Sequence, residues 1–213
     1  MRIPKHIGII PDGNRRWATS HGLSKDKGYS AGINPGLILF KQCEKFGIEE
    51  LTFYGFTVDN TKRPSVQKEA FTKACINAVN SLKGENVEIL VIGNTNSPCF
   101  PKELLCYTKP KKFGTGKTRV NFLINYGWEW DLNSLKTSDK TKKNITKNIQ
   151  SNDISRIDLI IRWGGRRRLS GFLPVQSVYS DFYIIDRYWP DFSPSDLEEA
   201  LNWYNTQDVT LGG

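Results

Sequence analysis

The chain has 213 residues, 30 Lys and Arg against 22 Asp and Glu, and a formal net charge of +8. Hydrophobic residues make up 38% of it, and no apolar run approaches the ~20 residues needed to cross a bilayer, so a spanning helix is excluded. The length predicts a single domain over residues 1–213. A soluble, cytoplasmic protein is expected, because the apolar stretch near the N-terminus is too short for a signal-peptide core.

The positive charge favours anionic partners, but it does not choose among nucleic acids, membrane surfaces and phosphorylated metabolites. The four cysteines show no C-x-x-C spacing, and the two histidines are not placed to complete a zinc set. We therefore expect free thiols. The choice of partner has to come from local motifs.

Six short apolar runs predict β-strands, at residues 6–10, 51–56, 87–92, 119–125, 157–161 and 182–185. The runs are mostly continuous in apolarity, which is typical of strands covered on both faces. The segments between them are long enough for crossover helices. The sequence thus predicts an α/β fold with a central, mostly parallel six-stranded sheet flanked by helices.

Three segments show helical patterns between or after these runs. Residues 28–46 and 65–82 carry apolar side chains near helical spacing, and the last helix begins at Ser193 as N-cap, with Pro194 at the first position and Asp196 at the third. Residues 136–152 are lysine-rich and almost without apolar side chains. They are interpreted as a solvated loop or a poorly packed helix, with a binding arm as the alternative.

Polar, cation-bearing segments follow three of the predicted strands. The first, PDGNRRW at residues 11–17, has an aspartate suited to Mg²⁺ and two arginines that can grip phosphate oxygens; the alternative is a simple Asp-Gly turn. The second is FTVDNTKRP at residues 56–64, which can also be read as a turn closing before a proline. The third is IIRWGGRRRLSGFLP at residues 160–174. Because parallel strands end at one edge of the sheet, the three loops are expected to converge there.

Together these segments resemble the cis-prenyltransferase family, whose best-known members are undecaprenyl diphosphate synthases. PDGNRRWA resembles the first family motif and FTVDNTKRP the second, while residues 157–183 resemble the long fifth motif, which WPDF at residues 189–192 continues. The resemblance runs in family order from residue 6 to residue 213. It implies one α/β domain with a parallel sheet, a deep hydrophobic tunnel, Mg²⁺ as cofactor and a homodimer.

The resemblance also implies the reaction and the residues that carry it. Family members transfer an allylic prenyl group from its diphosphate to isopentenyl diphosphate, so dimethylallyl, isopentenyl, geranyl or farnesyl diphosphate are the expected substrates. By position, Asp12 and Asn60 are catalytic, Asp12 and Asp181 are metal ligands, and Trp17, Tyr29, Phe56 and Trp163 line the substrate pocket. The expected diphosphate-binding residues are Gly13, Asn14, Arg15, Arg16, Lys25, Arg63, Arg162, Arg168 and Ser170. Preorganised arginines and Mg²⁺ would neutralise the leaving diphosphate.

The chain departs from the family pattern at several of these positions. Tyr29 replaces a histidine, Lys25 an arginine and Asp181 a glutamate, while Trp163 stands where a small hydroxyl residue is usual. Arg166 and Arg167 replace a motif that begins with Glu, and Trp128 occupies a usual glycine. Residues 100–116, which in long-chain enzymes contribute a tunnel helix, hold four lysines, two prolines and two glycines. These changes indicate a smaller pocket.

Several functions remain open on the sequence alone. A short product from one condensation of small units and an irregular, head-to-middle coupling of two dimethylallyl diphosphates, as in lavandulyl and cyclolavandulyl diphosphate synthases, are the main hypotheses. Long-chain synthesis and a non-catalytic subunit of the same fold are alternatives, although such subunits tend to lose the aspartate that Asp12 retains. A nucleic-acid partner is not expected, since only the charge supports it.

Overall fold

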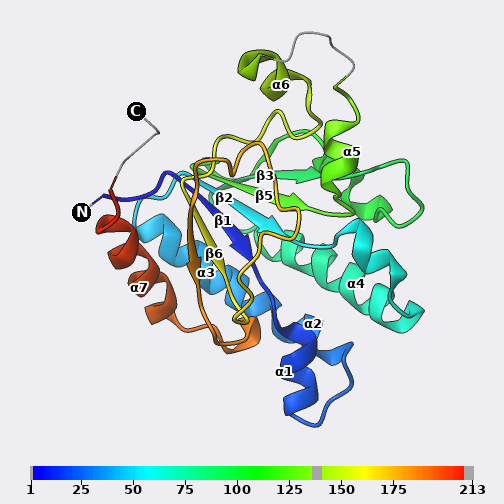
Figure 1. Cartoon of the computed structure of the whole chain (residues 1–213). Helices are drawn as coiled ribbons and strands as arrows, with labels where there is room; N and C mark the ends of the chain where they lie inside the picture. The colour runs from blue at the N-terminus through cyan, green and yellow to red at the C-terminus, as the bar shows by residue number, and fades with distance from the viewer. Residues whose placement is uncertain (1, 136–140, 209–213) are drawn as a thin grey trace.

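A computed structural model describes residues 2–135 and 141–208 of the chain. Helices and strands alternate around one seven-stranded sheet with the strand order β4-β3-β5-β2-β1-β6-β7 (Figure 1). Neighbouring strands are parallel except for β4, which runs antiparallel to β3. The strands are β1 (His6–Ile10), β2 (Glu50–Tyr54), β3 (Val87–Ile92), β4 (Lys111–Lys112), β5 (Thr118–Leu123), β6 (Leu159–Arg162) and β7 (Asp181–Ile184).

All six predicted strands are confirmed, and the mostly parallel α/β sheet with them. The number six is corrected to seven, because the sheet has one further edge strand, β4. That strand consists of two exposed lysines, Lys111 and Lys112, so it carries no apolar signal from which it could have been predicted.

The sheet is covered on both faces, as the continuous apolar runs predicted. Along β1, Ile7 and Ile9 belong to one buried cluster, whereas Ile10 belongs to another. On β6, Leu159 and Ile161 alternate with Ile160 in the same way. Because successive strand residues point to opposite faces, the two clusters are the two faces of the sheet.

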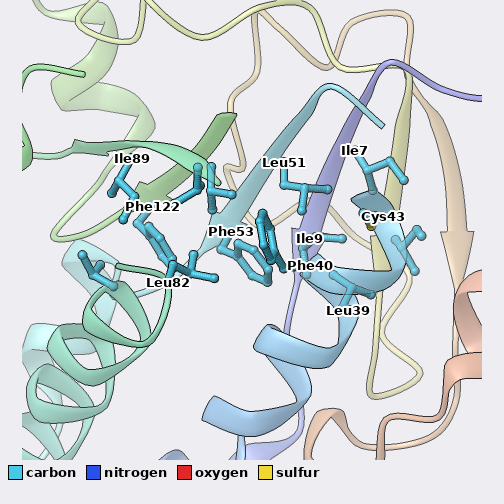
Figure 2. Packing of buried hydrophobic residues seen from close by; sticks show 14 of the residues in the cluster. Ile7, Ile9, Leu39, Phe40, Cys43, Leu51, Phe53, Leu82, Ile89 and Phe122 are labelled. Carbon is cyan, nitrogen blue, oxygen red and sulfur yellow. The ribbon is translucent and has the colours of Figure 1, made fainter. Parts of the chain in front are cut away.

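Helices α3 and α7, with the C-terminal half of α4, supply buried residues to the larger cluster, which Figure 2 shows in part. The helices are α1 (Asn14–Ser20), α2 (Lys27–Ala31), α3 (Ile33–Lys45), α4 (Ser65–Ser81), α5 (Trp128–Leu132), α6 (Lys142–Asn148) and α7 (Pro194–Asn205), with short 3₁₀ helices η1 (Val58–Lys62), η2 (Lys102–Tyr107) and η3 (Trp189–Asp191). No helix in the described ranges has the length and apolarity to span a membrane.

The helix expected over residues 28–46 is divided into α2 and α3 at Gly32. A glycine is needed at this point, because a Cβ on residue 32 would lie 2.6 Å from Asn14 Oδ1 and 2.8 Å from Trp189 Cδ1. Pro35 is tolerated because it lies in the first turn of α3, where no intrahelical N–H bond is needed. Gly32 thus lets α1 and η3 pack closely against the start of α3.

The other two predicted helices are confirmed. Helix α4 covers residues 65–81, and α7 begins with a capping box in which Ser193 and Asp196 satisfy each other's backbone N–H groups. In the lysine-rich segment, α6 has no buried residue, in agreement with a poorly packed helix. Residues 136–140 of that segment, and residues 209–213 at the end of the family resemblance, lie outside the described residues.

Candidate active site

The loops after β1, β2 and β6 converge on one cleft of about 760 Å³ at the carboxyl edge of the sheet. In Figure 1 this edge is the end toward which β1 runs to meet α1. The cleft is lined by all of the residues expected to be catalytic or to bind diphosphate: Asp12, Gly13, Asn14, Arg15, Arg16, Lys25, Asn60, Arg63, Arg162, Arg168 and Ser170. The convergence predicted from the three motifs is therefore confirmed.

Asp12 lies two residues after the end of β1, and both of its carboxylate oxygens have partners. Its Oδ2 accepts a hydrogen bond from Arg162 Nη2 at 2.7 Å, while Oδ1 accepts one from the Gly13 N–H at 2.6 Å and lies 3.3 Å from Arg16 Nη2. Burial raises the pKa of Asp12, but the hydrogen bond from Arg162 and the charges of Arg162 and Arg16 outweigh it, so the pKa lies below its ordinary value. Asp12 is therefore ionised at neutral pH.

Gly13 makes the turn from β1 into α1 possible. Its φ is +108°, and a Cβ at this position would lie 2.7 Å from Tyr188 Cδ1 and 3.1 Å from the Tyr188 Cα. A side chain would meet both backbone strain and a collision there. The glycine thus lets the backbone beside Asp12 approach the loop after β7 closely.

Arg162 is the last residue of β6 and its side chain is only 5% exposed. Besides Asp12, its guanidinium donates to Ser170 Oγ at 3.0 Å and to the Arg168 carbonyl, while its Nε is buried without a partner among the described residues. Ser170 has a φ of +54°, and its carbonyl accepts a hydrogen bond from the Tyr54 hydroxyl at 2.8 Å. A single buried arginine therefore joins the aspartate loop to the loop after β6.

Asn60 and Arg63 come from η1 and the residue that ends it. The Asn60 Oδ1 accepts the Thr57 N–H at 3.0 Å, which fixes the side chain as part of a capping box. Arg63 Nη1 donates to the Tyr29 hydroxyl at 3.0 Å, and its guanidinium carbon lies 5.5 Å from the centre of the Phe71 ring. Tyr29 stacks on Phe71 with ring centres 4.6 Å apart. The tyrosine that departs from the family pattern thus positions Arg63.

A second, apolar cavity of about 80 Å³ adjoins the cleft, and Pro11, Asn14, Tyr29, Gly55 and Phe71 line both. It extends between α3 and α4 on one side and β2 and β5 on the other. Its apolar walls include Ile33, Leu37, Phe53, Ala74, Cys75, Ala78, Leu82, Phe122, Ile124 and Trp189. Figure 2 shows Phe53, Phe122 and Leu82 close together in this layer. The resemblance predicts a deep hydrophobic tunnel, and this cavity is the apolar space that adjoins the cleft.

Only Tyr29 among the four expected substrate-pocket residues lines either cavity. Trp163 is fully buried; it packs edge-on against Trp189, and its Nε1 donates to Asp196 Oδ2 at 3.0 Å. Phe56 is turned into the core against Phe71, and Trp17 donates its Nε1–H to Asp191 at 2.6 Å. Phe56 and Trp163 are therefore buried core residues, and Trp17 is half-exposed; none of the three lines the cavities.

Asp181 does not join Asp12 in the cleft. It is the first residue of β7 and pairs in register with Leu159, which in turn pairs with Ile7, whereas Ile10 pairs with Arg162 at the other end of the strands. Three residues along a strand separate the two ends by about 10 Å. Asp181 instead forms an ion pair with Arg2 at 3.2 Å. Within one chain, the two expected metal ligands cannot hold the same ion.

Sequence reasoning did not assign Tyr54, Tyr188 and Arg166 to the site, although all three line the cleft. Tyr54 ends β2, so its position at the carboxyl edge could have been found from the strand prediction. Arg166 stands in the arginine-rich third motif. Tyr188 comes from the loop after β7, and no spacing in the sequence predicts its position in the cleft.

The cleft suits a magnesium ion that is shared with a diphosphate. No group of three His, Cys, Asp or Glu side chains in the described part of the chain could hold a metal by itself. Mg²⁺, however, is commonly bound by one or two carboxylates together with substrate phosphates. Asp12, ionised and 32% exposed to the cleft, is a carboxylate of that kind.

Comparisons with known proteins agree with the motifs. The sequence model of the family described as "Putative undecaprenyl diphosphate synthase" matches residues 10–212. A ditrans,polycis-undecaprenyl-diphosphate synthase of Aliivibrio fischeri is 30% identical over 99% of this chain and 89% of its own, and an isoprenyl transferase of Clostridium perfringens is 30% identical over 100% and 91%.

Among solved structures, lavandulyl diphosphate synthase from Lavandula x intermedia, in complex with dimethylallyl diphosphate, superimposes with a TM-score of 0.86. The match covers 99% of this chain and 98% of the synthase, at 22% identity. At that identity the likeness establishes the shared fold.

Proposed function

Since this chain belongs to the cis-prenyltransferase family and is a prenyltransferase, we propose that it condenses small isoprenoid diphosphates, with Mg²⁺, into a short-chain product and inorganic diphosphate. The allylic donor is of the size of dimethylallyl diphosphate, and the acceptor is isopentenyl or dimethylallyl diphosphate. The observation that supports this most directly is the joining of a cationic cleft to a small apolar cavity.

The cleft matches the charge of two diphosphates. Seven cationic side chains line it, against the carboxylates of Asp12 and Asp59, and Asp59 is already paired with Lys62 at 2.9 Å. Diphosphate oxygens accept bidentate hydrogen bonds from arginine, and such bonds are stronger than neutral ones. Two anionic substrates can therefore be held side by side: one near Arg15 and Arg16, the other near Arg162 and Arg168.

In the proposed reaction, the C–O bond of the allylic donor breaks and its electron pair leaves with the diphosphate. The double bond of the acceptor attacks the allylic carbon, and the new cation loses a proton to the diphosphate that the cleft holds. Arginines fixed before the reaction stabilise the charge as it grows on the leaving group, and a bound Mg²⁺ supplies further neutralisation there. Asp12 is the residue that would hold the ion, and Asn60 lies at the cleft wall to position the reacting carbon.

The size of the apolar cavity supports a short product. An apolar cavity of about 150 Å³ admits a benzene molecule, and the cavity here is about 80 Å³. A five-carbon prenyl tail is thus close to the limit of what the unexpanded cavity accepts. Leu82, Phe122 and Trp189 form part of its wall, and all three are at least 90% buried.

Head-to-middle coupling of two dimethylallyl diphosphates is the second candidate. The observation that favours it is the remodelled acceptor side of the cleft, where Arg166 stands in place of the usual glutamate. Regular and irregular coupling release the same diphosphate but differ in the carbon skeleton, so the products distinguish them.

A homodimer is also part of the proposal, because the family usually dimerises. The edge strand β7, with half-buried Phe182 and Tyr183, offers an unpaired strand edge in the described part of the chain. Sedimentation of the purified protein at the mass of two chains is the expected result, and a monomer at micromolar concentration would contradict it.

The function is tested by diphosphate release from dimethylallyl diphosphate, alone and with isopentenyl diphosphate. We expect release with Mg²⁺, none with EDTA, and a loss of at least about 100-fold in the Asp12→Ala variant, as for the removal of one group that stabilises transition-state charge. Asp153→Ala is the control, because Asp153 is exposed and lies outside the cleft. An Asp12→Ala variant as active as this control would overturn the assignment.

A further inference from the structure

We propose that Arg166 binds the diphosphate of the second substrate, and that binding on this side of the cleft requires no divalent metal. The inference rests on the proposed function for the kind of ligand, an isoprenoid diphosphate. It adds a residue and a metal requirement that the family resemblance does not supply, since the resemblance places a glutamate at this position.

The backbone that carries Arg166 is held in place at the edge of the cleft. Gly164 and Gly165, which precede it, have φ values of +83° and +69°, and their N–H groups donate to the carbonyls of Arg187 and Ile185 at 2.8 and 3.0 Å. A Cβ on Gly164 would lie 3.1 Å from the Asp12 carbonyl. The turn is therefore pinned between the aspartate loop and the segment after β7, and Arg166 lines the cleft from a fixed backbone.

The Arg166 side chain is exposed, and no hydrogen bond, ion pair or ring contact to it occurs among the described residues. The neighbouring Arg162, by contrast, is committed to Asp12 and Ser170. A guanidinium that lines the cleft and has no carboxylate partner among the described residues is available to an anion that enters the cleft.

The wall that carries Arg166 attracts a diphosphate and repels a metal ion. Residues 162–170 contain four arginines and no Asp or Glu, and three of those arginines line the cleft with Ser170. Mg²⁺ needs oxygen ligands, which guanidinium groups do not offer, and its own charge is repelled by theirs. Phosphate oxygens, in contrast, fit the planar guanidinium fork. This side of the cleft is therefore suited to a diphosphate without a metal.

Arg167 is a matched control for this inference. It is the next residue, it is also an exposed arginine, and it does not line the cleft. Replacing either residue with alanine lowers the net charge of the chain by the same one unit. Any difference between the two variants therefore reports the position of Arg166 and not the overall charge.

The test is calorimetric titration of the folded protein with inorganic diphosphate, in EDTA and in Mg²⁺. We expect the wild type and Arg167→Ala to bind inorganic diphosphate in EDTA. Arg166→Ala should bind it about 10- to 100-fold more weakly, as for the loss of one hydrogen bond to a charged group. Arg166→Lys should recover part of the affinity. Equal affinities for Arg166→Ala and Arg167→Ala, or no binding by the wild type without Mg²⁺, would overturn the inference.

Steady-state kinetics separate this inference from the proposed function. With isopentenyl diphosphate varied, Arg166→Ala should raise KM about 10-fold or more with little change in kcat, because a ground-state contact is lost. If the wild type turns over and both alanine variants have the same KM, the role of Arg166 is contradicted but the proposed function is not. No turnover by the wild type would instead count against the function, while the calorimetric result for Arg166 would still hold.

Discussion

At the scale of single residues, the contact between Asp12 and Arg162 links the two halves of the cleft. Arg162 is nearly inaccessible, and it donates to Asp12 Oδ2 at 2.7 Å. The same guanidinium donates to Ser170 Oγ at 3.0 Å, so the aspartate loop and the loop after β6 are held in one arrangement.

The same contact makes a prediction about stability. The pKa of Asp12 is lowered in the folded chain, so the stabilisation from its charge is present above the unfolded-state pKa of about 3.9 and is lost as the pH falls through the lower folded-state value. Asp12→Asn should cost about 1 to 2 kcal/mol at neutral pH, after allowance for solvent screening. Urea unfolding should show that this difference shrinks at about pH 3. A difference that stays constant with pH would contradict the ion pair.

At the scale of the elements, α4 and the sheet set the depth of the apolar cavity. Leu82, the residue that ends α4, is 3% exposed and lines the cavity, whereas Val79, one turn earlier, is fully buried in the core and does not. The two residues therefore separate the effect of core packing from the effect of cavity size.

Leu82→Ala should lengthen the main product by at least one five-carbon unit, because the cavity gains the space of the lost side chain. Large-to-small replacements of buried leucine cost about 2 to 5 kcal/mol, so the variant should also be less stable. Val79→Ala should lose stability without a change of product. Product masses and urea unfolding of both variants provide the measurement, and a longer product from Val79→Ala alone would refute the assignment.

The connection between β6 and α7 explains why Trp163 stands where the family has a small residue. Its indole N–H donates to Asp196, whose carboxylate also caps α7 through the Ser193 N–H at 3.0 Å. Its ring packs on Trp189, which does line the apolar cavity. From inside the core, Trp163 thus stabilises the N-terminus of α7 and the position of Trp189 in the cavity wall.

Trp163→Phe should therefore affect stability and not product length. Loss of the indole donor leaves Asp196 with one hydrogen bond fewer, at a cost of about 1 to 3 kcal/mol, while the ring contact with Trp189 is largely kept. Thermal unfolding measures the loss of stability, and product analysis shows whether the product length is unchanged. A shifted product distribution at wild-type stability would show that Trp163 acts on the substrate.

The strands and the convergence of the three loops could be predicted, because both follow from local apolarity and from the rule for parallel strands. The close packing at Gly32 could not, since it involves Asn14 and Trp189, which are distant in sequence. The placement of Phe56 and Trp163 in the core could not be predicted, because an aromatic residue near a strand end has the same sequence pattern whether it faces a cavity or the core. The distance of Asp181 from Asp12 could have been predicted, because a residue that begins a parallel strand lies at the edge of the sheet opposite to the cleft.

At the scale of the whole molecule, the chain has 30 basic and 22 acidic residues, and part of the positive charge is concentrated at one place. Among the described residues, seven of the cations line one cleft, beside an apolar cavity of about 80 Å³. Charge of this kind steers small anions and raises their local concentration. For a prenyltransferase, the proposed short product follows from this combination of a large cationic cleft and a small apolar cavity.

The most direct test of this account is the mass spectrum of the products formed with Mg²⁺ from isopentenyl diphosphate and, in separate reactions, dimethylallyl, geranyl and farnesyl diphosphate. The account predicts efficient use of dimethylallyl diphosphate and products that stop after about one condensation, as expected for a tail cavity below the size that holds a benzene molecule. Polyprenyl products of many units, or preferred use of farnesyl diphosphate, would contradict it.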